Sequence, residues 1–333
     1  MCYLIREKKR DFWVEVYLRP EFIFGLFLLP KMPLSEIVPS FIGRHFSITK
    51  KYKGEKEMKK VLSLLLGAAL TAALLAGCGT QEQGASPKEN EVLRVGMEAA
   101  YAPFNWTQKD SSNGGVPIEG TSEYAGGYDV EIAKKIAEGL GKELVVVKTE
   151  WGGLLPSLTS GTIDAIVAGM SPTADRKEVI DFSDNYYKSD LVMVVKRGGN
   201  YEQASSIQDF KNARVTGQLN TSHYKVIDQI DGVIKEAAMD DFPAMRVALE
   251  SGIIDGYVSE RPEGISASAA NNNFVMLEFT EGFEVTDEDA AVAVGLKKGS
   301  ELTGKINEIL AGISESQRQE IMDTAISNQP SEQ

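Results

Sequence analysis

The sequence predicts an α/β protein built from two similar lobes, and two observations support this. First, Leu158–Val167 (Leu-Thr-Ser-Gly-Thr-Ile-Asp-Ala-Ile-Val) recurs as Leu249–Val258 (Leu-Glu-Ser-Gly-Ile-Ile-Asp-Gly-Tyr-Val). Each copy is typical of a helix end, a glycine stop and a short apolar strand. Second, strand and helix patterns alternate on both sides of Leu191–Lys196, which predicts parallel-rich sheets flanked by helices in both halves.

Polar, proline-containing segments follow both repeated strands. Gly169–Thr173 follows the first strand, and Ser259–Pro262 follows the second. Ligands of open α/β sheets bind beyond the carboxyl ends of the strands, so the two segments are expected to face each other across a cleft. A duplicated packing unit needs no ligand. That simpler interpretation explains the apolar positions but not the polar residues that follow them.

The elements of the first half are assigned in chain order. Strands are expected at Leu93–Met97 and Val145–Lys148, and helices at Asp129–Leu140, at Leu154–Ser160 and from Thr173. The stretch between the first strand and Gly127 is long and polar, and we expect a surface loop there.

The second half repeats the alternation and then returns to the first lobe. Its expected strands and helices are Arg214–Thr216, a helix from Thr221, Gly232–Glu236, a helix from about Asp241, Phe274–Leu277, Ala291–Leu296, Glu301–Ala311 and Glu315–Ser327. With Leu191–Lys196 as the outward crossing and Glu284–Ala290 as the return, lobe 1 is expected to comprise 91–195 and 288–333, and lobe 2 to comprise 196–287. The two crossings would form the hinge.

The segment from Met58 has the pattern of a secretory signal. Met58-Lys59-Lys60 precedes an apolar run that is too short for a comfortable transmembrane helix and ends in Leu-Ala-Gly-Cys78. This ending resembles the lipobox of bacterial lipoproteins, which implies that Cys78 is acylated and that 58–77 is removed. A plain signal or an anchor helix is the alternative. The following residues, 78–90, predict a flexible tether.

Residues 1–57 fit neither a signal nor a domain, because prolines interrupt their apolar pattern. We expect translation to start at Met58 and 1–57 to be an over-extended, unstructured N-terminus. A genuine short cytoplasmic extension is the alternative.

The composition narrows the classes of function. The chain has 48 acidic and 35 basic residues, a net charge of −13, which argues against nucleic acid and against lying flat on anionic lipid. From Cys78 onward there is one histidine, His223, and no second cysteine. Hence we expect no disulfide, zinc site or nucleophile–histidine–acid set, and no cofactor.

Several motifs resemble the amino-acid-binding proteins of ABC importers. They are Met97–Phe104, Gly127–Val130, Gly169-Met-Ser-Pro-Thr-Ala-Asp-Arg176, Ile180–Ser183, Tyr186-Tyr187 and Gln218–Ser222. The resemblance covers 91–333 and is most specific at Ser171 to Arg176. It implies a type-2 periplasmic-binding fold, two α/β lobes joined by two strands that close around one ligand.

The resemblance assigns roles to residues from both lobes. Arg176 would hold the ligand carboxylate through two parallel hydrogen bonds, a geometry that lysine lacks. Ser171, Thr221 and Ser222 would add donors. In the alternative, Arg176 merely pairs with a neighbouring aspartate on the surface.

The ammonium is assigned to Glu260, where the family usually has aspartate. The Gly169 carbonyl and the Ser171 hydroxyl would complete its cage. A solvated loop role for Glu260 is the alternative, since a buried, unpaired glutamate is costly.

The ligand side chain is assigned to Tyr101 and Trp151, which would sandwich it, and to Glu98 at its far end. Gln218 and Ser259 are further selectors. An acid between aromatic faces favours a polar or cationic amino acid: arginine, lysine, histidine and glutamine, in that order.

The predicted function is that of a lipid-anchored, monomeric receptor on the extracytoplasmic face of the cell membrane. It would deliver an amino acid to an ABC permease and its ATPase, and it would not be an enzyme. The alternatives are a dehydratase of the same fold that acts on prephenate-like acids, with Glu260 as general acid, and a ligand-sensing module.

Overall fold

The computed structural model describes residues 3–9, 12–18 and 92–330. The chain divides into two compact units, Met1–Gly84 and Ala85–Gln333. In the first unit, β1 (Tyr3–Lys9) pairs with β2 (Phe12–Leu18) in an antiparallel hairpin.

This hairpin corrects the expectation that 1–57 is unstructured. Phe12–Leu18 reads Phe-Trp-Val-Glu-Val-Tyr-Leu, a run of β-branched and aromatic residues that favours a strand. The proline interruptions on which the expectation rested begin only at Pro20. The signal segment 58–77, the tether 78–90 and Cys78 all lie outside the described residues.

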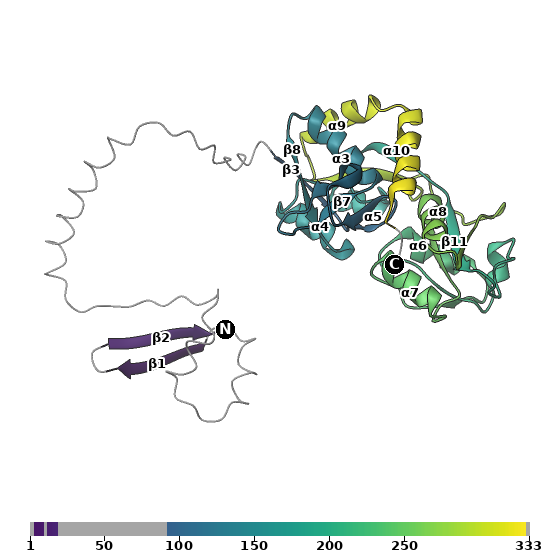
Figure 1. Cartoon of the computed structure of the whole chain (residues 1–333), viewed down its shortest axis with the longest axis horizontal. Coiled ribbons are helices and arrows are strands. Elements are labelled where there is room, and N and C mark those ends of the chain that lie inside the picture. Colours follow the sequence, from purple (N-terminus) through teal and green to yellow (C-terminus); the bar gives the residue numbers. More distant parts are fainter. Residues whose placement is uncertain (1–2, 10–11, 19–91, 331–333) are drawn as a thin grey trace. The chain divides into compact units, whose positions relative to one another are not determined.

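The second unit contains two lobes, each organised around a five-stranded sheet (Figure 1). The sheet of lobe 1 has the order β10-β16-β9-β3-β8. Its strands are β3 (Val92–Met97), β8 (Glu143–Lys148), β9 (Ala165–Ile166), β10 (Asp181–Lys188) and β16 (Ala291–Leu296). Strand β3 runs parallel to β8 and β9, whereas β16 runs antiparallel to both of its neighbours, β9 and β10.

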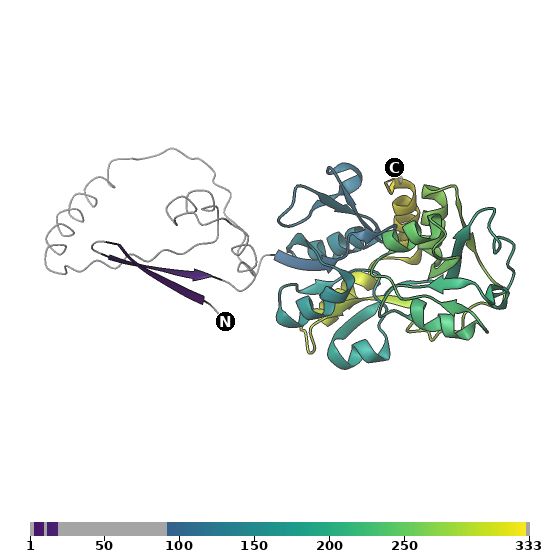
Figure 2. The same ribbon diagram turned by 90° about the horizontal axis from the view of Figure 1, so that it is seen from below.

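Five helices belong to lobe 1: α3 (Tyr128–Gly139), α4 (Trp151–Ser160), α5 (Ala174–Val179), α9 (Leu302–Ala311) and α10 (Glu315–Asn328). In Figure 2 the yellow C-terminal helices lie among the blue elements of the same lobe, so the chain returns to its starting lobe. The apolar face of α3 packs against this sheet and buries Ile132 and Ile136 completely.

The stretch expected to be a loop is instead an antiparallel sheet with the order β4-β5-β7-β6. Its strands are β4 (Ala100–Tyr101), β5 (Asn105–Gln108), β6 (Val116–Pro117) and β7 (Tyr124–Gly126), with a short 3₁₀ turn η4 at Ser112–Gly114. These strands are two to four residues long, which is too short for an alternating pattern to emerge from the sequence.

Lobe 2 has the sheet order β13-β12-β14-β11-β15. Its elements are β11 (Leu191–Lys196), η5 (Ile207–Phe210), β12 (Arg214–Thr216), α6 (Ser222–Lys225), η6 (Val226–Gln229), β13 (Ile234–Lys235), α7 (Phe242–Glu250), β14 (Gly256–Glu260), α8 (Arg261–Ala270) and β15 (Phe274–Leu277). Strands β12, β13 and β14 are parallel, and β11 is antiparallel to both β14 and β15.

The lobes meet at two crossings. Strand β11 belongs entirely to the sheet of lobe 2, so the outward crossing is at Ser189-Asp190, between β10 and β11, and not at the expected 195/196 boundary. The return crossing lies between β15 and β16, within 278–290, a range that includes the expected segment. The end of α10 in lobe 1 also contacts lobe 2: Gln329 Nε2 donates to the Ser266 carbonyl of α8 over 3.1 Å, and the two side chains are hydrogen-bonded.

Candidate functional site

A small cavity of about 10 Å³ lies between the lobes, at the carboxyl ends of β9, β12 and β14. It is lined by Tyr101, Trp151, Gly169, Ser171, Arg176, Gln218, Thr221, Ser222, His223 and Glu260. The structure therefore brings together all the predicted ligand-binding residues except Glu98 and Ser259. His223 is the one lining residue that the sequence prediction did not assign.

A glycine is required at the turn after β9. Gly169 has φ of +62°, and a Cβ there would lie 2.6 Å from Tyr101 Cε1, so a side chain would be both strained and displaced. The Gly169 amide donates to the Tyr186 hydroxyl over 3.3 Å, and that hydroxyl donates to Asp129 over 2.7 Å. This buried chain of hydrogen bonds fixes the turn that delivers Ser171 to the cavity.

Asp129 also supports the Tyr101 side of the cavity. It accepts a hydrogen bond from Asn105, whose side chain in turn accepts from the Ala99 amide, two residues before Tyr101. Burial raises the pKa of Asp129 to about 6, because the hydrogen bonds from Tyr186 and Asn105 only partly offset the loss of solvent.

Arg176, on the short helix α5, reaches across the gap between the lobes. Its Nη1 donates to the Ser171 carbonyl over 2.8 Å, and its Nη2 donates to the Asn220 carbonyl of lobe 2 over 2.9 Å. The guanidinium also lies 5.0 Å from the centre of the Trp151 ring. Burial lowers the pKa of Arg176 to about 10, so the group is a cation at neutral pH. It does not pair with Asp181, which is bound by Lys298 at 3.0 Å.

The hydroxyls assigned to the ligand carboxylate have protein partners. Ser171 Oγ donates to the Asp289 carbonyl over 3.0 Å, and Thr221 Oγ1 donates to the Gln218 carbonyl over 2.6 Å. Ser222 begins α6, and Thr221 is its N-cap residue. Because a hydroxyl has a single proton, Ser171 and Thr221 would have to exchange these partners in order to donate to a ligand.

Glu260 is the N-cap residue of α8 and is 4% exposed. Its Oε1 lies 3.1 Å from His223 Nε2, and its Oε2 is buried without a hydrogen-bond partner in the described part of the chain. Burial raises the pKa of Glu260 to about 8 and lowers that of His223 to about 3. The solvated loop role considered for Glu260 is therefore wrong.

The Tyr101 ring, which is expected to sandwich the ligand side chain together with Trp151, packs against two phenylalanines in the structure. Tyr101 stacks on Phe104 at 4.9 Å and on Phe242 of lobe 2 at 4.4 Å, so both faces of its ring are covered. Trp151 lies beside the Arg176 guanidinium. Sequence positions alone do not reveal that Phe242, at the first turn of α7, crosses from the other lobe.

Glu98 lies on a second cavity of about 640 Å³ that shares Trp151 with the first. Gln218 Nε2 donates to its two carboxylate oxygens over 3.1 and 3.2 Å, which links the lobes again. Burial raises the pKa of Glu98 to about 7. The same cavity is lined by further acidic residues and one lysine: Glu150, Asp240, Asp241 and Lys148. Ser259 is fully buried in β14, and its hydroxyl has no partner among the described residues.

The sequence profile of the bacterial extracellular solute-binding proteins, family 3, matches residues 93–327. The chain belongs to this family. The match includes both lobes and both crossings, which agrees with the two-lobed fold described above.

Two curated relatives of this family-3 protein cover most of the chain. The arginine-binding extracellular protein ArtP of Bacillus subtilis (strain 168) is 29% identical over 270 residues, which are 76% of this chain and 92% of the relative. A probable histidine-binding protein of Neisseria gonorrhoeae is 30% identical over 266 residues, with 78% and 92% covered.

A solved structure shares the fold of this family-3 protein. It is an amino acid ABC transporter substrate-binding protein from Streptococcus pneumoniae Canada MDR_19A bound to L-arginine. The TM-score is 0.64 at 25% identity, and the match covers 72% of this chain and 95% of that one. The two-lobed, type-2 periplasmic-binding fold predicted from the sequence is thus confirmed.

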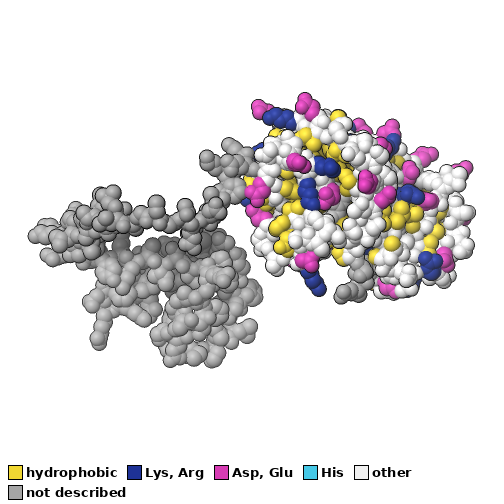
Figure 3. All heavy atoms as spheres, turned by 45° about the horizontal axis from the view of Figure 1, so that its top comes forward, with side chains coloured by type: hydrophobic (Ala, Val, Ile, Leu, Met, Phe, Trp, Pro, Cys, Tyr) yellow, Lys and Arg dark blue, Asp and Glu magenta, His cyan; other side chains and the backbone are white. Residues whose placement is uncertain are grey.

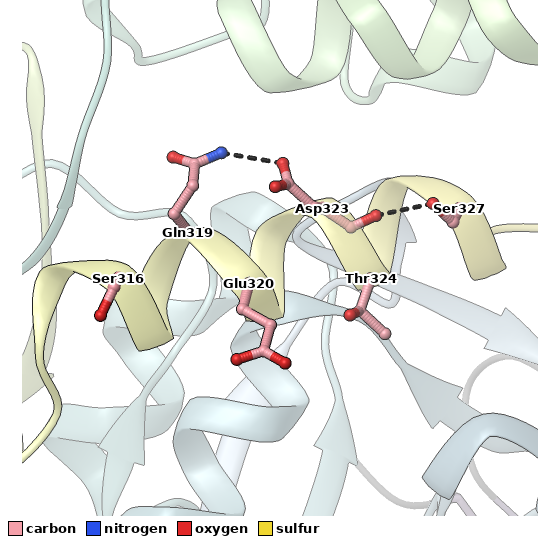
Figure 4. Close-up of a pocket in the computed structure, with 6 residues that line it drawn as sticks. All are labelled: Ser316, Gln319, Glu320, Asp323, Thr324 and Ser327. Carbon is pink, nitrogen blue, oxygen red and sulfur yellow. Dashed lines mark hydrogen bonds between the residues drawn. The ribbon is translucent and has the colours of Figure 1, made fainter.

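In the part of the chain that the structure describes, the other surface features of the family-3 protein do not resemble a ligand-binding site. A wide, open depression of about 500 Å³ lies on α10 and is lined by the polar residues in Figure 4, among which Gln319 donates to Asp323 over 2.8 Å. Acidic and basic side chains are interspersed on the face seen in Figure 3. Over the described ranges, no cluster of three or more His, Cys, Asp or Glu could bind a metal. Nor does any helix of those ranges combine the length and apolarity needed to cross a bilayer.

Proposed function

We propose that this solute-binding protein captures a free amino acid with a cationic side chain between its lobes and passes it to an ABC permease. One observation carries the proposal: the Arg176 guanidinium of lobe 1 and the Glu260 carboxylate of lobe 2 line the same buried cavity. A zwitterionic amino acid has the two complementary charges on one carbon, so it can neutralise both groups at once.

The carboxylate end of the ligand is assigned to Arg176. In the structure this guanidinium donates to two backbone carbonyls, and a carboxylate would replace them with charge-assisted hydrogen bonds. Trp151 would keep the guanidinium plane in place while its partners change.

The ammonium end is assigned to the unpartnered Oε2 of Glu260. Its burial makes the ionised carboxylate costly without a cation, so the ammonium supplies what the site lacks. The Gly169 carbonyl and Ser171 remain the proposed additional contacts.

The side chain of the ligand is assigned to the acidic cavity around Glu98. Four acidic residues and one lysine line it, and this excess of acidic groups favours a cation in the cavity. ArtP is named for arginine binding, and the Streptococcus pneumoniae neighbour is bound to L-arginine. We therefore rank arginine first, followed by lysine, histidine and glutamine.

Entry of the ligand requires the lobes to part. The first cavity is too small for an amino acid, and Tyr101 is covered by Phe242. The contacts that Arg176 and Tyr101 make with lobe 2 must therefore loosen. A ligand that touches Arg176 and Glu260 stabilises the closed form, because it contacts both lobes at once only when the lobes are closed. Rotation at Ser189-Asp190 and within 278–290 would bring Trp151 and Tyr101 into reach of the ligand side chain.

The same proposal covers how the amino acid reaches the permease and where the protein is located. The closed lobes would present a joint surface to the permease, whose ATPase drives uptake. Lipidation at Cys78, with the tether at 78–90, would hold a monomeric receptor at the extracytoplasmic face of the membrane. The family match favours binding over a dehydratase activity, and Glu260 is proposed as a ligand contact and not as a general acid.

Calorimetric titration of the purified protein with each of the twenty amino acids at pH 8 tests the proposal. Arginine should bind most tightly, lysine next, and aliphatic amino acids most weakly. Mass spectrometry of the small molecules that co-purify with the protein is an independent check. Tightest binding of an aliphatic amino acid, or no amino-acid binding at all, would refute the proposal.

A further inference from the structure

The buried pair of His223 and Glu260 stands out among the cavity residues. The imidazole Nε2 and the carboxylate Oε1 are 3.1 Å apart, and the two side chains come from different elements, α6 and β14. Their outer atoms, His223 Nδ1 and Glu260 Oε2, are buried and have no hydrogen-bond partner among the described residues. Both residues line the cavity, so the free oxygen is available to a ligand that enters it.

We propose that His223 is a positioning residue, which holds Glu260 Oε1 so that Oε2 receives the ligand ammonium, and that amino-acid binding releases the proton of Oε2. The inference rests on the proposed function and adds to it a residue and a measurable proton. His223 need not touch the ligand for this role.

The geometry explains how a glutamate serves where the resemblance leads one to expect an aspartate. The extra methylene carries the carboxylate to the imidazole, which then fixes one oxygen and leaves the other free. His223 is itself held in place. Its ring packs edge-on against Phe242 at 6.2 Å, and Gly217 permits α6 to lie close to β12, since a Cβ there would be 2.9 Å from the His223 carbonyl carbon.

The proton balance follows from the burial of both groups. Burial raises the pKa of Glu260 to about 8 and lowers that of His223 to about 3, so near neutral pH the carboxyl is protonated and the imidazole is uncharged. The imidazole keeps its proton on Nε2 and donates it to Oε1, while Oε2 carries the carboxyl proton. When the ammonium arrives, the O–H bond at Oε2 breaks, its proton passes to solvent, and an ammonium N–H donates to Oε2 instead.

The groups around the pair act in the same direction. Arg176, from α5, disfavours the imidazolium form of His223. Glu263, on the first turn of α8, disfavours the ionised form of Glu260, and it is itself bound by Arg246 at 2.8 Å and by the Tyr257 hydroxyl at 3.0 Å. Tyr101 is the remaining titratable side chain on this cavity, and its hydroxyl has no partner in the described ranges. An ammonium beside Oε2 offsets the repulsion from Glu263.

Proton release can be counted by calorimetry with arginine in buffers of different ionisation enthalpy. The Glu98→Gln background is used, because Glu98 is the other cavity carboxyl whose pKa burial raises. We expect release of about 0.9 proton at pH 7 and about half a proton at pH 8, where the free ligand is still almost entirely the ammonium form. Adding Glu260→Gln should abolish the release.

Three variants separate positioning from mere packing. His223→Gln keeps an amide donor near the place of Nε2, and it should bind within about threefold of the wild type with the same pH profile. His223→Phe keeps a ring but has no donor for Glu260 Oε1. This variant should bind arginine at least about tenfold more weakly, and its proton release should persist to higher pH because the Glu260 carboxylate is less stabilised. Glu260→Asp, which is too short for the contact with His223, should also bind at least about tenfold more weakly.

Either of two results with variants would overturn the positioning role of His223: His223→Phe with the affinity and pH profile of the wild type, or Glu260→Asp with equal or tighter binding. The Glu260→Asp variant retains His223, so it tests the contact between the two residues even if His223→Phe fails to fold. Failure of the wild type to bind arginine at pH 8 would instead refute the proposed function. Arginine binding without proton release refutes only the present inference.

Discussion

The two repeated segments of the chain are built alike but end differently. In lobe 1 the Asp164 amide donates to the Arg94 carbonyl over 2.8 Å, and its carboxylate accepts from the Arg94 amide over 2.9 Å. In lobe 2 Asp255 makes the same pair of bonds with Arg214, both over 2.8 Å. Each aspartate thus joins the start of its own strand to the first parallel strand of its lobe.

The difference lies beyond the strands. After β9 the chain turns at Gly169 and enters α5, which carries a cation, Arg176. After β14 it enters α8 directly, with an acid, Glu260, as the N-cap residue and Pro262 at the first turn. Repetition therefore preserves the backbone bonds and the core. The binding chemistry resides in the residues by which the repeats differ, and opposite charges there suit the two ends of one zwitterion.

The largest effect is expected at the cationic end. Arg176→Ala removes the proposed partner of the ligand carboxylate and should raise the Kd for arginine by at least about 100-fold, or about 3 kcal/mol. Titration calorimetry measures it. Arg94→Ala is the matched control, because its side chain pairs with Glu119 at the surface and does not line either cavity, and it should change the Kd less than twofold. An Arg176→Ala variant within threefold of the wild type would remove the anchor.

An intermediate effect on affinity is expected at Glu98. This acidic residue belongs to lobe 1, the lobe that also supplies the cationic Arg176. Its carboxylate must ionise to bind a cationic side chain, and its pKa is about 7. As the pH falls below 7, the affinity for arginine should therefore fall. In Glu98→Gln the slope of log Kd against pH between 5 and 6.5 should be shallower by about one. An unchanged slope would place the cationic side chain elsewhere.

Glu98 also makes a prediction for stability. Its folded pKa is raised from 4.5, so its contribution to stability is fully present below pH 4.5 and is lost as the pH rises through about 7. Without added amino acid, Glu98→Gln should therefore have a higher Tm than the wild type at pH 8 and a similar Tm at pH 4. A lower Tm at pH 8 would contradict this account.

The smallest effect sharpens the comparison of the two aspartates. Asp255 also pairs with the Arg214 guanidinium at 2.8 Å, whereas the Arg94 side chain turns to Glu119. Asp255→Asn should cost about 1 kcal/mol in urea unfolding at pH 7, and Asp164→Asn about half of that. The pKa of Asp255 is lowered by Arg214, so its excess should disappear as the pH falls below 3.8. Equal costs at pH 7 would show that the guanidinium adds nothing.

The sequence predicted the features that depend on short patterns. The two lobes follow from alternation and repetition, and the roles of Arg176 and Glu260 follow from the resemblance to amino-acid-binding proteins. Edge strand β10 was missed because Asp181–Lys188 is largely polar, and α8 because it begins directly at the end of β14. His223 was considered only as evidence against a metal site. Its role depends on a contact across 37 positions, which no local pattern reveals.

The contact between Gln329 and Ser266 has a mechanical consequence. These residues lie on opposite sides of the lobe boundary, and Ser266 is fully buried, so the carboxyl end of α10 is fastened to α8. The chain crosses the boundary twice, and this contact joins the lobes without a covalent crossing, as the hydrogen bonds of Arg176 to Asn220 and of Gln218 to Glu98 also do. Because this contact must break or stretch when the lobes separate, the last turn of α10 helps to set how far lobe 2 can rotate away from lobe 1.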